Sequence, residues 1–180
     1  MPCGKSRRNI SMNKLLIIGA GAHSEVVREV AKSCGYSEFV FVDDSEDLLS
    51  SGRAQYNTAA LSWLGKDYED AFVSVGNNQV RKFMYDLLAK NGYNIPSLIH
   101  PTAYISPTAV IGKGSLIGPM SIINSNAIIG QGCILSCSAV VDHNVIVSDF
   151  AHIDAGAVCE SYSTVDLYAK ISAGTVNRKQ

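Results

Sequence analysis

The chain has 180 residues, of which 47% are hydrophobic and 17% are charged, so it can form one large or two small packed domains and is not expected to be disordered. Its formal net charge of −1 argues against binding nucleic acid or an anionic membrane surface. The five cysteines are odd in number and lack metal-type spacing, which indicates a reduced, cytoplasmic protein without a metal site.

Residues 1–12 (MPCGKSRRNISM) are polar and contain no apolar stretch of signal-peptide length. We treat them as a leader or disordered segment and regard Met12 as a candidate start. No run in the chain approaches the roughly 18 apolar residues that cross a membrane, so we expect no membrane insertion.

Residues 13–94 have the alternating strand, turn and helix patterns of a small Rossmann-like α/β domain. Apolar runs predict buried strands at 14–18, 39–42 and 71–75, and a glycine turn at 19–24 follows the first. One helix runs from about Val26 to Gly35, and a second begins near 78 and stops at 91–92, with Asn78 as its candidate N-cap.

The glycine turn lies where a strand hands over to a helix, a position whose N–H groups favour a phosphate. The pattern G-x-G-x-x-G is only partly met, because Ser24 takes the place of the third glycine. Asp43, followed by Asp44, lies where a ribose-binding acid would end the second strand. The turn is either a bare structural turn or a nucleotide site, and the short domain favours a mononucleotide or nucleotide-sugar. We expect Arg81 to lie on a solvated helix face rather than to hold an anion.

Residues 95–180 repeat every six residues, which is typical of a parallel β-helix. Stepping by six from Ile99 to Ile171 gives aliphatic residues at every step except Cys159, and we expect these step residues to fill the interior. At 18 residues per three-sided coil, the repeat covers a little over four coils. Apolar residues also recur at the outward positions Ile122, Ile128, Ile134, Val140 and Ile146. An apolar stripe of this length predicts burial between copies of the chain, and we expect a homotrimer.

His143 lies between the inward residues Val141 and Val145, so its side chain is expected on the outside of the coil. An imidazole can take a proton near neutral pH, although a lone surface histidine is more often inert. His152 follows half a coil later and is expected on the opposite side, so the two share a site only if another subunit contributes. His100 precedes Pro101 and is taken as structural.

Taken together, these segments resemble the nucleotide-sugar acyltransferases of the left-handed β-helix superfamily, in particular the UDP-bacillosamine N-acetyltransferases and the sialic acid O-acetyltransferases. The resemblance covers about residues 13–176. It rests on the following segments: 17–23 (IIGAGAH), 42–44 (VDD), 75–81 (VGNNQVR), 98–103 (LIHPTA), 142–143 (DH) and 150–156 (FAHIDAG).

The resemblance implies a left-handed coil and a homotrimer, with acetyl-CoA as co-substrate lying between adjacent β-helices and no metal. It implies that His143, beside Asn144, is the general base. The coenzyme would meet His152, Ser161 and Ala173. The nucleotide-sugar, with UDP favoured, would meet a set of residues in the first domain: Gly19, Gly21, Ala22, His23, Asp43, Asp44 and Asn77.

The expected activity is acetyl transfer to the amino group of a nucleotide-linked amino-deoxysugar, as in cell-surface glycan biosynthesis. Three departures from the family keep alternatives open: Asn144 stands where relatives often have an acid, residues 159–164 (CESYST) replace a glycine-bearing hexad, and the chain stops at Gln180. One alternative is O-acetylation of a sugar hydroxyl, of the sialic acid type. The other is a non-catalytic sugar-nucleotide-binding homologue that lost its coenzyme site.

Overall fold

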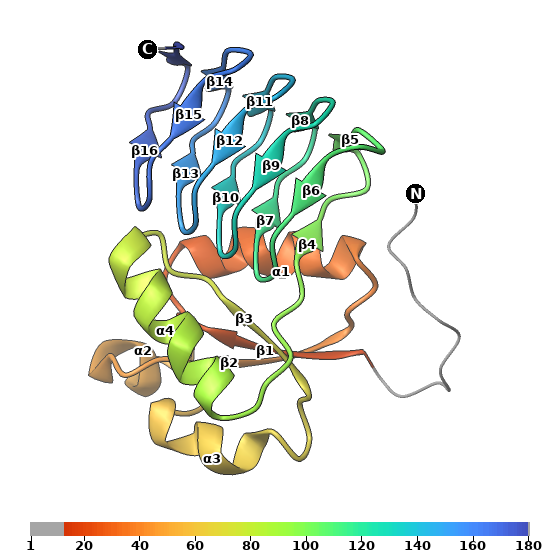
Figure 1. The fold of residues 1–180 in the computed structure, drawn as a ribbon. Coiled ribbons are helices and arrows are strands. Elements are labelled where there is room, and N and C mark those ends of the chain that lie inside the picture. The colour runs from red at the N-terminus through yellow and green to blue at the C-terminus, as the bar shows by residue number, and fades with distance from the viewer. Residues whose placement is uncertain (1–12, 180) are drawn as a thin grey trace. The chain divides into compact units, whose positions relative to one another are not determined.

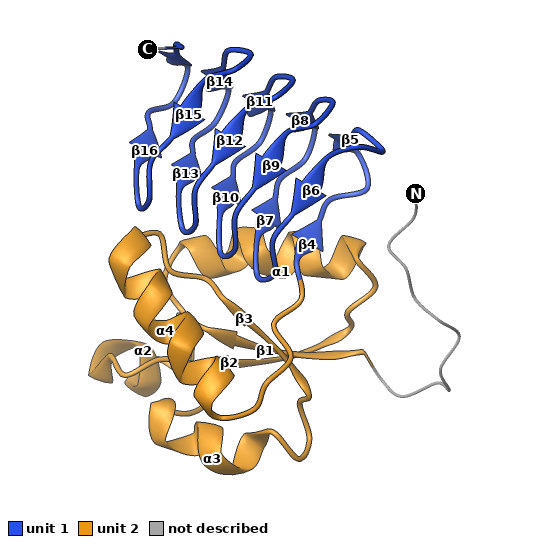
Figure 2. Cartoon of the chain, in the orientation of Figure 1, with its two compact units in different colours: residues 1–3, 97–180 blue, residues 4–96 orange. Residues whose placement is uncertain are grey.

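The computed structural model describes residues 13–179, so the expected leader at 1–12 lies outside the described residues. The described part forms two compact units, one ending at Pro96 and one beginning at Ser97 (Figure 2). The boundary expected from the sequence was between 94 and 95. The first unit is an α/β domain and the second is a β-helix, as the sequence predicted (Figure 1).

The α/β unit is built on a three-stranded parallel sheet with the strand order β2-β1-β3. Its strands are β1 (Lys14–Ile18), β2 (Glu38–Val42) and β3 (Asp70–Val73). The central strand β1 pairs with a neighbour on each edge, and its residues from Leu15 to Ile18 are buried. The helices are α1 (His23–Ser33), α2 (Glu46–Ser50), η1 (Thr58–Ala60), α3 (Leu61–Leu64) and α4 (Asn78–Lys90).

Two local expectations change in this unit. The N-cap of α4 is Asn77 and not Asn78, since the Asn77 side chain accepts hydrogen bonds from the N–H groups of Gln79 (3.1 Å) and Val80 (3.0 Å). The elements α2, η1 and α3 had no sequence prediction, because segments of three to five residues are too short to display a helical period.

The β-helix consists of two-residue strands that form three parallel faces. The first face contains β4 (Leu98–Ile99), β7 (Leu116–Ile117), β10 (Ile134–Leu135), β13 (His152–Ile153) and β16 (Lys170–Ile171). The second contains β5 (Tyr104–Ile105), β8 (Ile122–Ile123), β11 (Val140–Val141), β14 (Val158–Cys159) and β17 (Val176–Asn177). The third contains β6 (Val110–Ile111), β9 (Ile128–Ile129), β12 (Ile146–Val147) and β15 (Thr164–Val165).

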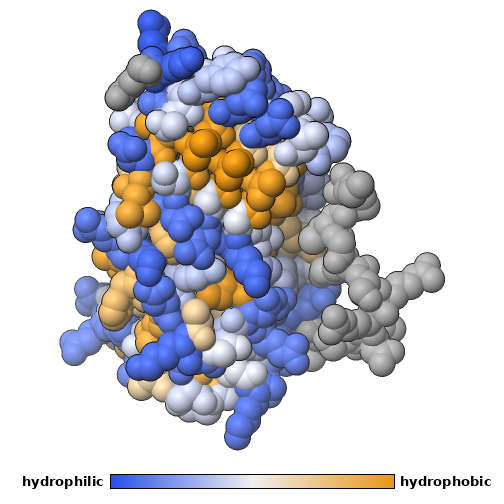
Figure 3. Space-filling view, in the orientation of Figure 1, coloured by the Kyte–Doolittle hydropathy of each residue, from blue (hydrophilic) through white to orange (hydrophobic). Residues whose placement is uncertain are grey.

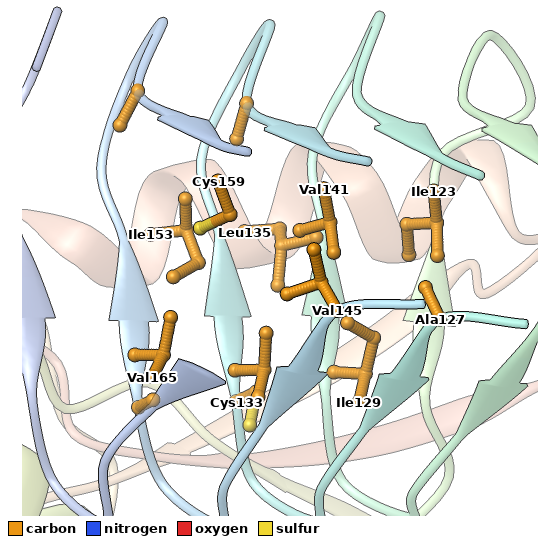
Figure 4. Packing of buried hydrophobic residues seen from close by; sticks show 14 of the residues in the cluster. Ile123, Ala127, Ile129, Cys133, Leu135, Val141, Val145, Ile153, Cys159 and Val165 are labelled. Carbon is orange, nitrogen blue, oxygen red and sulfur yellow. The ribbon is translucent and has the colours of Figure 1, made fainter. Parts of the chain in front are cut away.

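The step residues fill the interior of this coil, as the hexad register predicted (Figure 4). From Ile117 to Val165 every step residue is buried, and the strand pairing sets it in register with the step residue of a neighbouring coil. Ile99, Ile105, Ile111 and Ile171 are only partly buried, because the coils at the two ends have a neighbouring coil on one side alone.

The corners between faces share one backbone conformation, a residue with a positive φ angle. From Gly114 to Gly174, every sixth residue has a positive φ, whether or not it is glycine. The positions not occupied by glycine are Met120, Asn126, Ser138, Asn144, Phe150, Tyr162 and Tyr168. Only glycine and, to a lesser degree, asparagine adopt this left-handed conformation at little cost, so the corners carry local strain that the stacked strands compensate.

The outward apolar residues do not form the single stripe that the sequence predicted. A spacing of six moves each successive residue to the next face, so that Ile134 lies on the first face and is buried, whereas Ile122 and Ile128 lie on the second and third faces and are exposed. The stripes instead run at a spacing of one coil. The clearest is formed by Val110, Ile128 and Ile146 along the third face, where Figure 3 shows a hydrophobic band.

Candidate active site

In the α/β unit, the predicted nucleotide-binding residues lie at the carboxyl ends of the three strands. Parallel sheets bind ligands at this edge. Gly19 follows β1, has φ +96°, and its N–H donates to the carbonyl oxygen of Val42 (2.8 Å). A Cβ at this position would lie 3.0 Å from the Val75 side chain, so glycine is required both by conformation and by space.

The helix α1 begins directly after this loop. The Gly21 carbonyl accepts hydrogen bonds from the Ser24 N–H (3.0 Å) and hydroxyl (2.7 Å), which closes a tight turn around Ala22 and His23. The N–H groups of a first helical turn have no partner within the helix, and the helix dipole makes this end positive. The loop therefore has the geometry of an anion site.

The two acids after β2 are part of the loop's support. Asp43 accepts from the Ala20 N–H (2.8 Å) with one carboxylate oxygen and from the Ser45 N–H (2.9 Å) with the other. Asp44 accepts from the Thr58 N–H (2.8 Å) and from its hydroxyl. Each carboxylate oxygen has two lone pairs, so both acids can still accept a further hydrogen bond from a ribose hydroxyl. Contact with a ribose stays a prediction for both.

Sequence reasoning missed one cationic residue near the loop. Arg53 Nη2 lies 3.5 Å from the Gly21 carbonyl oxygen, and Arg53 lines a 200 Å³ cavity together with Ala20, Ser24 and Arg28. Arg28 is ion-paired with Glu25, whereas Arg53 is exposed. Arg53 carries no sequence signal because it lies in the 45–69 segment, which lacks a period.

The expectation for Arg81 was wrong. This side chain is not on a solvated face: only 2% of it is exposed, and Nη1 donates to the carbonyl oxygens of Val75 (3.0 Å) and Gly76 (3.2 Å). The guanidinium therefore fixes the turn between β3 and α4, just before the cap residue Asn77. The helical spacing of apolar residues could not reveal this. An arginine on the polar face of a helix gives the same sequence pattern whether its side chain points into solvent or folds back onto the preceding turn.

In the β-helix, His143 lies at the corner between the second and third faces, which we call the His143 corner (residues 106–109, 124–127, 142–145 and 160–163). Asp142 Oδ1 accepts hydrogen bonds from the Asn124 side-chain amide (2.9 Å) and from the His143 backbone N–H (2.7 Å). The Asn124 amide and, next, the His143 N–H hold the pKa of Asp142 below its usual range. Asp142 therefore fixes the backbone of His143 and not its ring.

The ring itself is held by Asn144. Its side-chain Nδ2 lies 2.8 Å from His143 Nδ1, and its Oδ1 accepts a hydrogen bond from Asn126 Nδ2 (3.3 Å) in the preceding coil. Asn144 has φ 57°, a conformation that asparagine tolerates. Because Asn144 occupies Nδ1, the nitrogen that remains for a substrate is Nε2.

On the following coil, Tyr162 covers the imidazole. The two rings are perpendicular, with centroids 5.2 Å apart, and the Tyr162 N–H donates to the His143 carbonyl oxygen (3.2 Å). Lys179 Nζ lies 5.4 Å from the centre of the Tyr162 ring. In the sequence, residues 159–164 differ from the family pattern, but their role could not be predicted. The structure places the Tyr162 ring of this segment against the His143 imidazole.

The three expected coenzyme residues are not all near His143 within one chain. Ser161 lies at the His143 corner, one coil further along. His152 lies on the first face, is only 8% exposed, and its Nε2 is 3.0 Å from Ser136 Oγ and 3.8 Å from Asp154 Oδ1. Ala173 lies at the exposed corner between the first and second faces. A shared coenzyme site for these residues stays a prediction that needs more than one chain.

Within residues 13–179, the side chains of His, Cys, Asp and Glu form no cluster of three or more that could hold a metal ion. In the same described part, none of the helices combines the length and the apolar character needed to span a bilayer.

Comparison with known proteins places both units. Residues 14–88 match the family model described as the PglD N-terminal domain. The acetyltransferase domain of PglB from Neisseria gonorrhoeae FA1090 is similar in structure, with a TM-score of 0.84 and 33% identity over 93% of this chain and 83% of that one. The same domain in complex with acetyl coenzyme A gives a TM-score of 0.78 and 30% identity, over 93% and 94% of the two chains.

A curated relative, the UDP-N-acetylbacillosamine N-acetyltransferase of Bacillus subtilis (strain 168), is 32% identical over 109 residues. The match spans 58% of this chain and half the length of that relative. PerB from Caulobacter crescentus, solved with CoA and GDP-perosamine, has a TM-score of 0.69 over 96% of this chain and 94% of that one. At 22% identity, that likeness supports the fold alone.

Proposed function

The chain belongs to the left-handed β-helix family of acetyl-CoA-dependent nucleotide-sugar acetyltransferases, and we propose that it transfers an acetyl group to the amino group of a nucleotide-linked amino-deoxysugar. The observation that carries this proposal is the His143 imidazole, which Asn144 holds by Nδ1 so that Nε2 is left for a substrate. The similarity to a domain solved with acetyl coenzyme A supports the donor, and the name of the Bacillus relative supports a UDP-linked acceptor.

In the proposed reaction, the neutral amine of the sugar attacks the thioester carbonyl and a C–N bond forms. In the tautomer that carries its hydrogen on Nδ1, His143 Nε2 takes the proton that the attacking nitrogen loses, which is general base catalysis. The tetrahedral intermediate then collapses, the C–S bond breaks, and the imidazolium returns the proton to the departing CoA sulfur. The products are the N-acetyl sugar and CoA. Backbone N–H groups of a facing coil would stabilise the oxyanion.

The α/β unit would hold the nucleotide. The N–H groups of Gly21 and Ala22, next to the positive end of α1, are proposed for the diphosphate, since those of Gly19 and Ala20 already donate to Val42 and Asp43. Arg53 adds a cation beside the Gly21 carbonyl. Asp43 and Asp44 are proposed for the ribose, and Asn77 closes the same edge. Because Asp43 also ties the loop to β2 through the Ala20 N–H, Asp43→Ala should weaken UDP binding by two routes.

We further propose that the active form is a homotrimer in the cytoplasm, with acetyl-CoA lying between adjacent β-helices. In that assembly Ser161 would lie beside the His143 of its own chain, whereas His152 or Ala173 would come from a neighbouring chain. The exposed apolar residues of the second and third faces support this assembly.

A thiol-release assay with acetyl-CoA and UDP-, GDP- or TDP-linked amino sugars tests the proposal. His143→Ala should lower turnover by about 10² to 10⁴ and leave nucleotide affinity nearly unchanged. His100→Ala, at a half-buried histidine whose ring contacts Thr102, is the histidine control and should remain active. An active His143→Ala enzyme would overturn the assignment of the base. The absence of transfer from wild type with every sugar would favour the non-catalytic homologue, and transfer to a hydroxyl alone would favour the O-acetyltransferase.

A further inference from the structure

His143, Asn144 and Asn126 form a chain of hydrogen-bonding side chains at the His143 corner. Asn144 Nδ2 lies 2.8 Å from His143 Nδ1, and Asn126 Nδ2 donates to Asn144 Oδ1 at 3.3 Å. Asn126 precedes Asn144 by 18 residues and therefore lies at the same position of the neighbouring coil. Whatever fixes the amide of Asn126 also acts, through Asn144, on the imidazole.

The orientation of Asn144 decides the tautomer of the ring. A neutral imidazole carries its hydrogen on one nitrogen and a lone pair on the other. With Asn144 Nδ2 facing Nδ1, Nδ1 accepts and Nε2 carries the hydrogen, so Nε2 cannot accept a proton. A base at Nε2 needs the opposite arrangement, in which the Nδ1–H donates to Asn144 Oδ1.

The two amides must turn together. Rotating the Asn144 amide by 180° exchanges its oxygen and nitrogen, and its Nδ2 would then face Nδ2 of Asn126, which puts two donors in contact. Rotating Asn126 as well presents its oxygen to Asn144, and both hydrogen bonds of the chain are kept. The amide of Asn126 and the tautomer of His143 are therefore coupled.

We propose that Asn126 is a positioning residue of the acetyl transfer, which acts through Asn144 to decide which nitrogen of His143 keeps its lone pair. The inference rests on the proposed function for its catalytic meaning, but the coupling itself is a property of the three side chains. In the state that supports transfer, Asn126 Oδ1 accepts from Asn144 Nδ2, and Asn144 Oδ1 accepts from the Nδ1–H of His143.

The backbone narrows the choice of test variants. Asn126 has φ 58°, and its N–H donates to Thr108 Oγ1 (2.9 Å), so a replacement must tolerate the left-handed conformation. Aspartate and glycine both do. Asn126→Asp leaves only an acceptor facing Asn144, whereas Asn126→Gly removes the side chain without adding strain. Ser125→Ala, at the neighbouring exposed residue, is the matched control.

The test is nitrogen NMR on protein labelled with ¹⁵N-histidine, at a pH at which the ring is neutral, with the His143 signals assigned by their loss in His143→Ala. Asn126→Asp should shift the ring toward the Nδ1–H tautomer and keep or raise turnover. Asn126→Gly should reduce the Nδ1–H fraction relative to Asn126→Asp and lower turnover by about 2- to 10-fold with an unchanged KM for the sugar, the range of one hydrogen bond. Ser125→Ala should alter neither.

Identical tautomer populations in wild type, Asn126→Asp and Asn126→Gly would overturn the inference, whatever the activities. If wild type transferred no acetyl group but the tautomer followed the residue at position 126, the proposed function would fail and the coupling would be supported. Tautomers that shift while turnover stays constant in all variants would overturn the positioning role.

Discussion

Beside the proposed base, this chain has an uncharged amide, which can orient an imidazole but cannot offset its positive charge. Asn144→Asp is the informative change at this residue, because aspartate has the same length and tolerates the φ of 57° better than the longer glutamate does. The carboxylate can only accept, so it should fix the Nδ1–H and stabilise the imidazolium.

We expect Asn144→Asp to keep or increase turnover and to move the acidic limb of the pH–rate profile to higher pH. The profile of kcat against pH, compared with that of wild type, is the measurement. In the same background Asn126→Gly should have little effect, since the carboxylate needs no second residue to choose its orientation. A large loss of turnover in Asn144→Asp would contradict the view that Asn144 acts by accepting from the ring.

Asp142 predicts a pH dependence of stability at the residue scale. Its pKa is lowered in the folded protein, chiefly by the Asn124 amide and then by the His143 N–H. The contribution of the Asp142 carboxylate to the free energy of unfolding is therefore fully present above the usual aspartate pKa. It is lost as the pH falls through the lowered pKa of the folded protein.

In urea unfolding, the difference in free energy between wild type and Asp142→Asn should be constant near neutral pH and shrink as the pH falls below about 4. Leu167→Ala, an exposed change without a titrating group, should give a difference that does not vary with pH. A difference for Asp142→Asn that grows toward acid pH would refute the sign of the effect.

At the scale of the element, one corner column combines glycine with an aromatic residue. Gly132 has φ +61°, and a Cβ there would lie 2.3 Å from a ring carbon of Phe150, a side chain that is fully buried. Gly156 has nearly the same backbone, φ +64°, but a Cβ there would meet nothing within 4 Å. The two glycines therefore separate the cost of conformation from the cost of overpacking.

Gly156→Ala should lower the free energy of unfolding by about 1 to 2 kcal/mol, the cost of the left-handed conformation. Gly132→Ala should lower it by about 2 to 4 kcal/mol, because the clash with Phe150 is added. Chemical denaturation of both variants measures the difference. Equal losses would mean that Phe150 moves aside without cost and that the interior is less tightly packed than the structure indicates.

The elements predicted from the sequence are those with a strict period. The hexad fixed the phase of the step residues from Ile99 to Ile171, so the interior of the β-helix followed directly. The left-handed positions were also present in the sequence, because Gly114, Gly132, Gly156 and Gly174 share one phase, but Met120 and Tyr162 hide that phase. The short helices at 46–64 and the inward turn of Arg81 depend on tertiary contacts, which no local period carries.

At the scale of the whole molecule, the exposed apolar columns of the β-helix lead to a prediction about assembly. Ile128 and Ile146 are 46% and 48% exposed on the same face, one coil apart. We expect light scattering to give the mass of a trimer at micromolar concentration. Ile128→Glu with Ile146→Glu should yield folded monomers, because a trimer interface over this face would bury two unpaired carboxylates against apolar surface.

Phe83→Glu, at an apolar residue on α4 that is 64% exposed, is the control and should not change the mass. A monomeric wild type would remove the basis for placing acetyl-CoA between subunits.

The site as a whole was predictable only in part. His143 and Asn144 stood out because they are polar residues between inward valines, and the structure brings their rings and amides together. Asn126 and Tyr162 were missed, since they are 17 and 19 residues away from His143 and become its neighbours only when the coil length of 18 is applied. Arg53 could not be found from any pattern, because its place depends on the fold of an irregular segment.

The pairing of each strand with the one 18 residues away also limits how this chain can change in length. Loss or gain of a single residue would put every later residue out of phase, whereas loss of a whole coil preserves faces, corners and interior alike. A chain without residues 118–135 would still wind continuously from Ile117 into Ser136, but Thr108 would then lie beneath Asn144 in place of Asn126. A change in length by whole coils thus leaves the architecture nearly unchanged, but it can still change the residues that surround the proposed base His143.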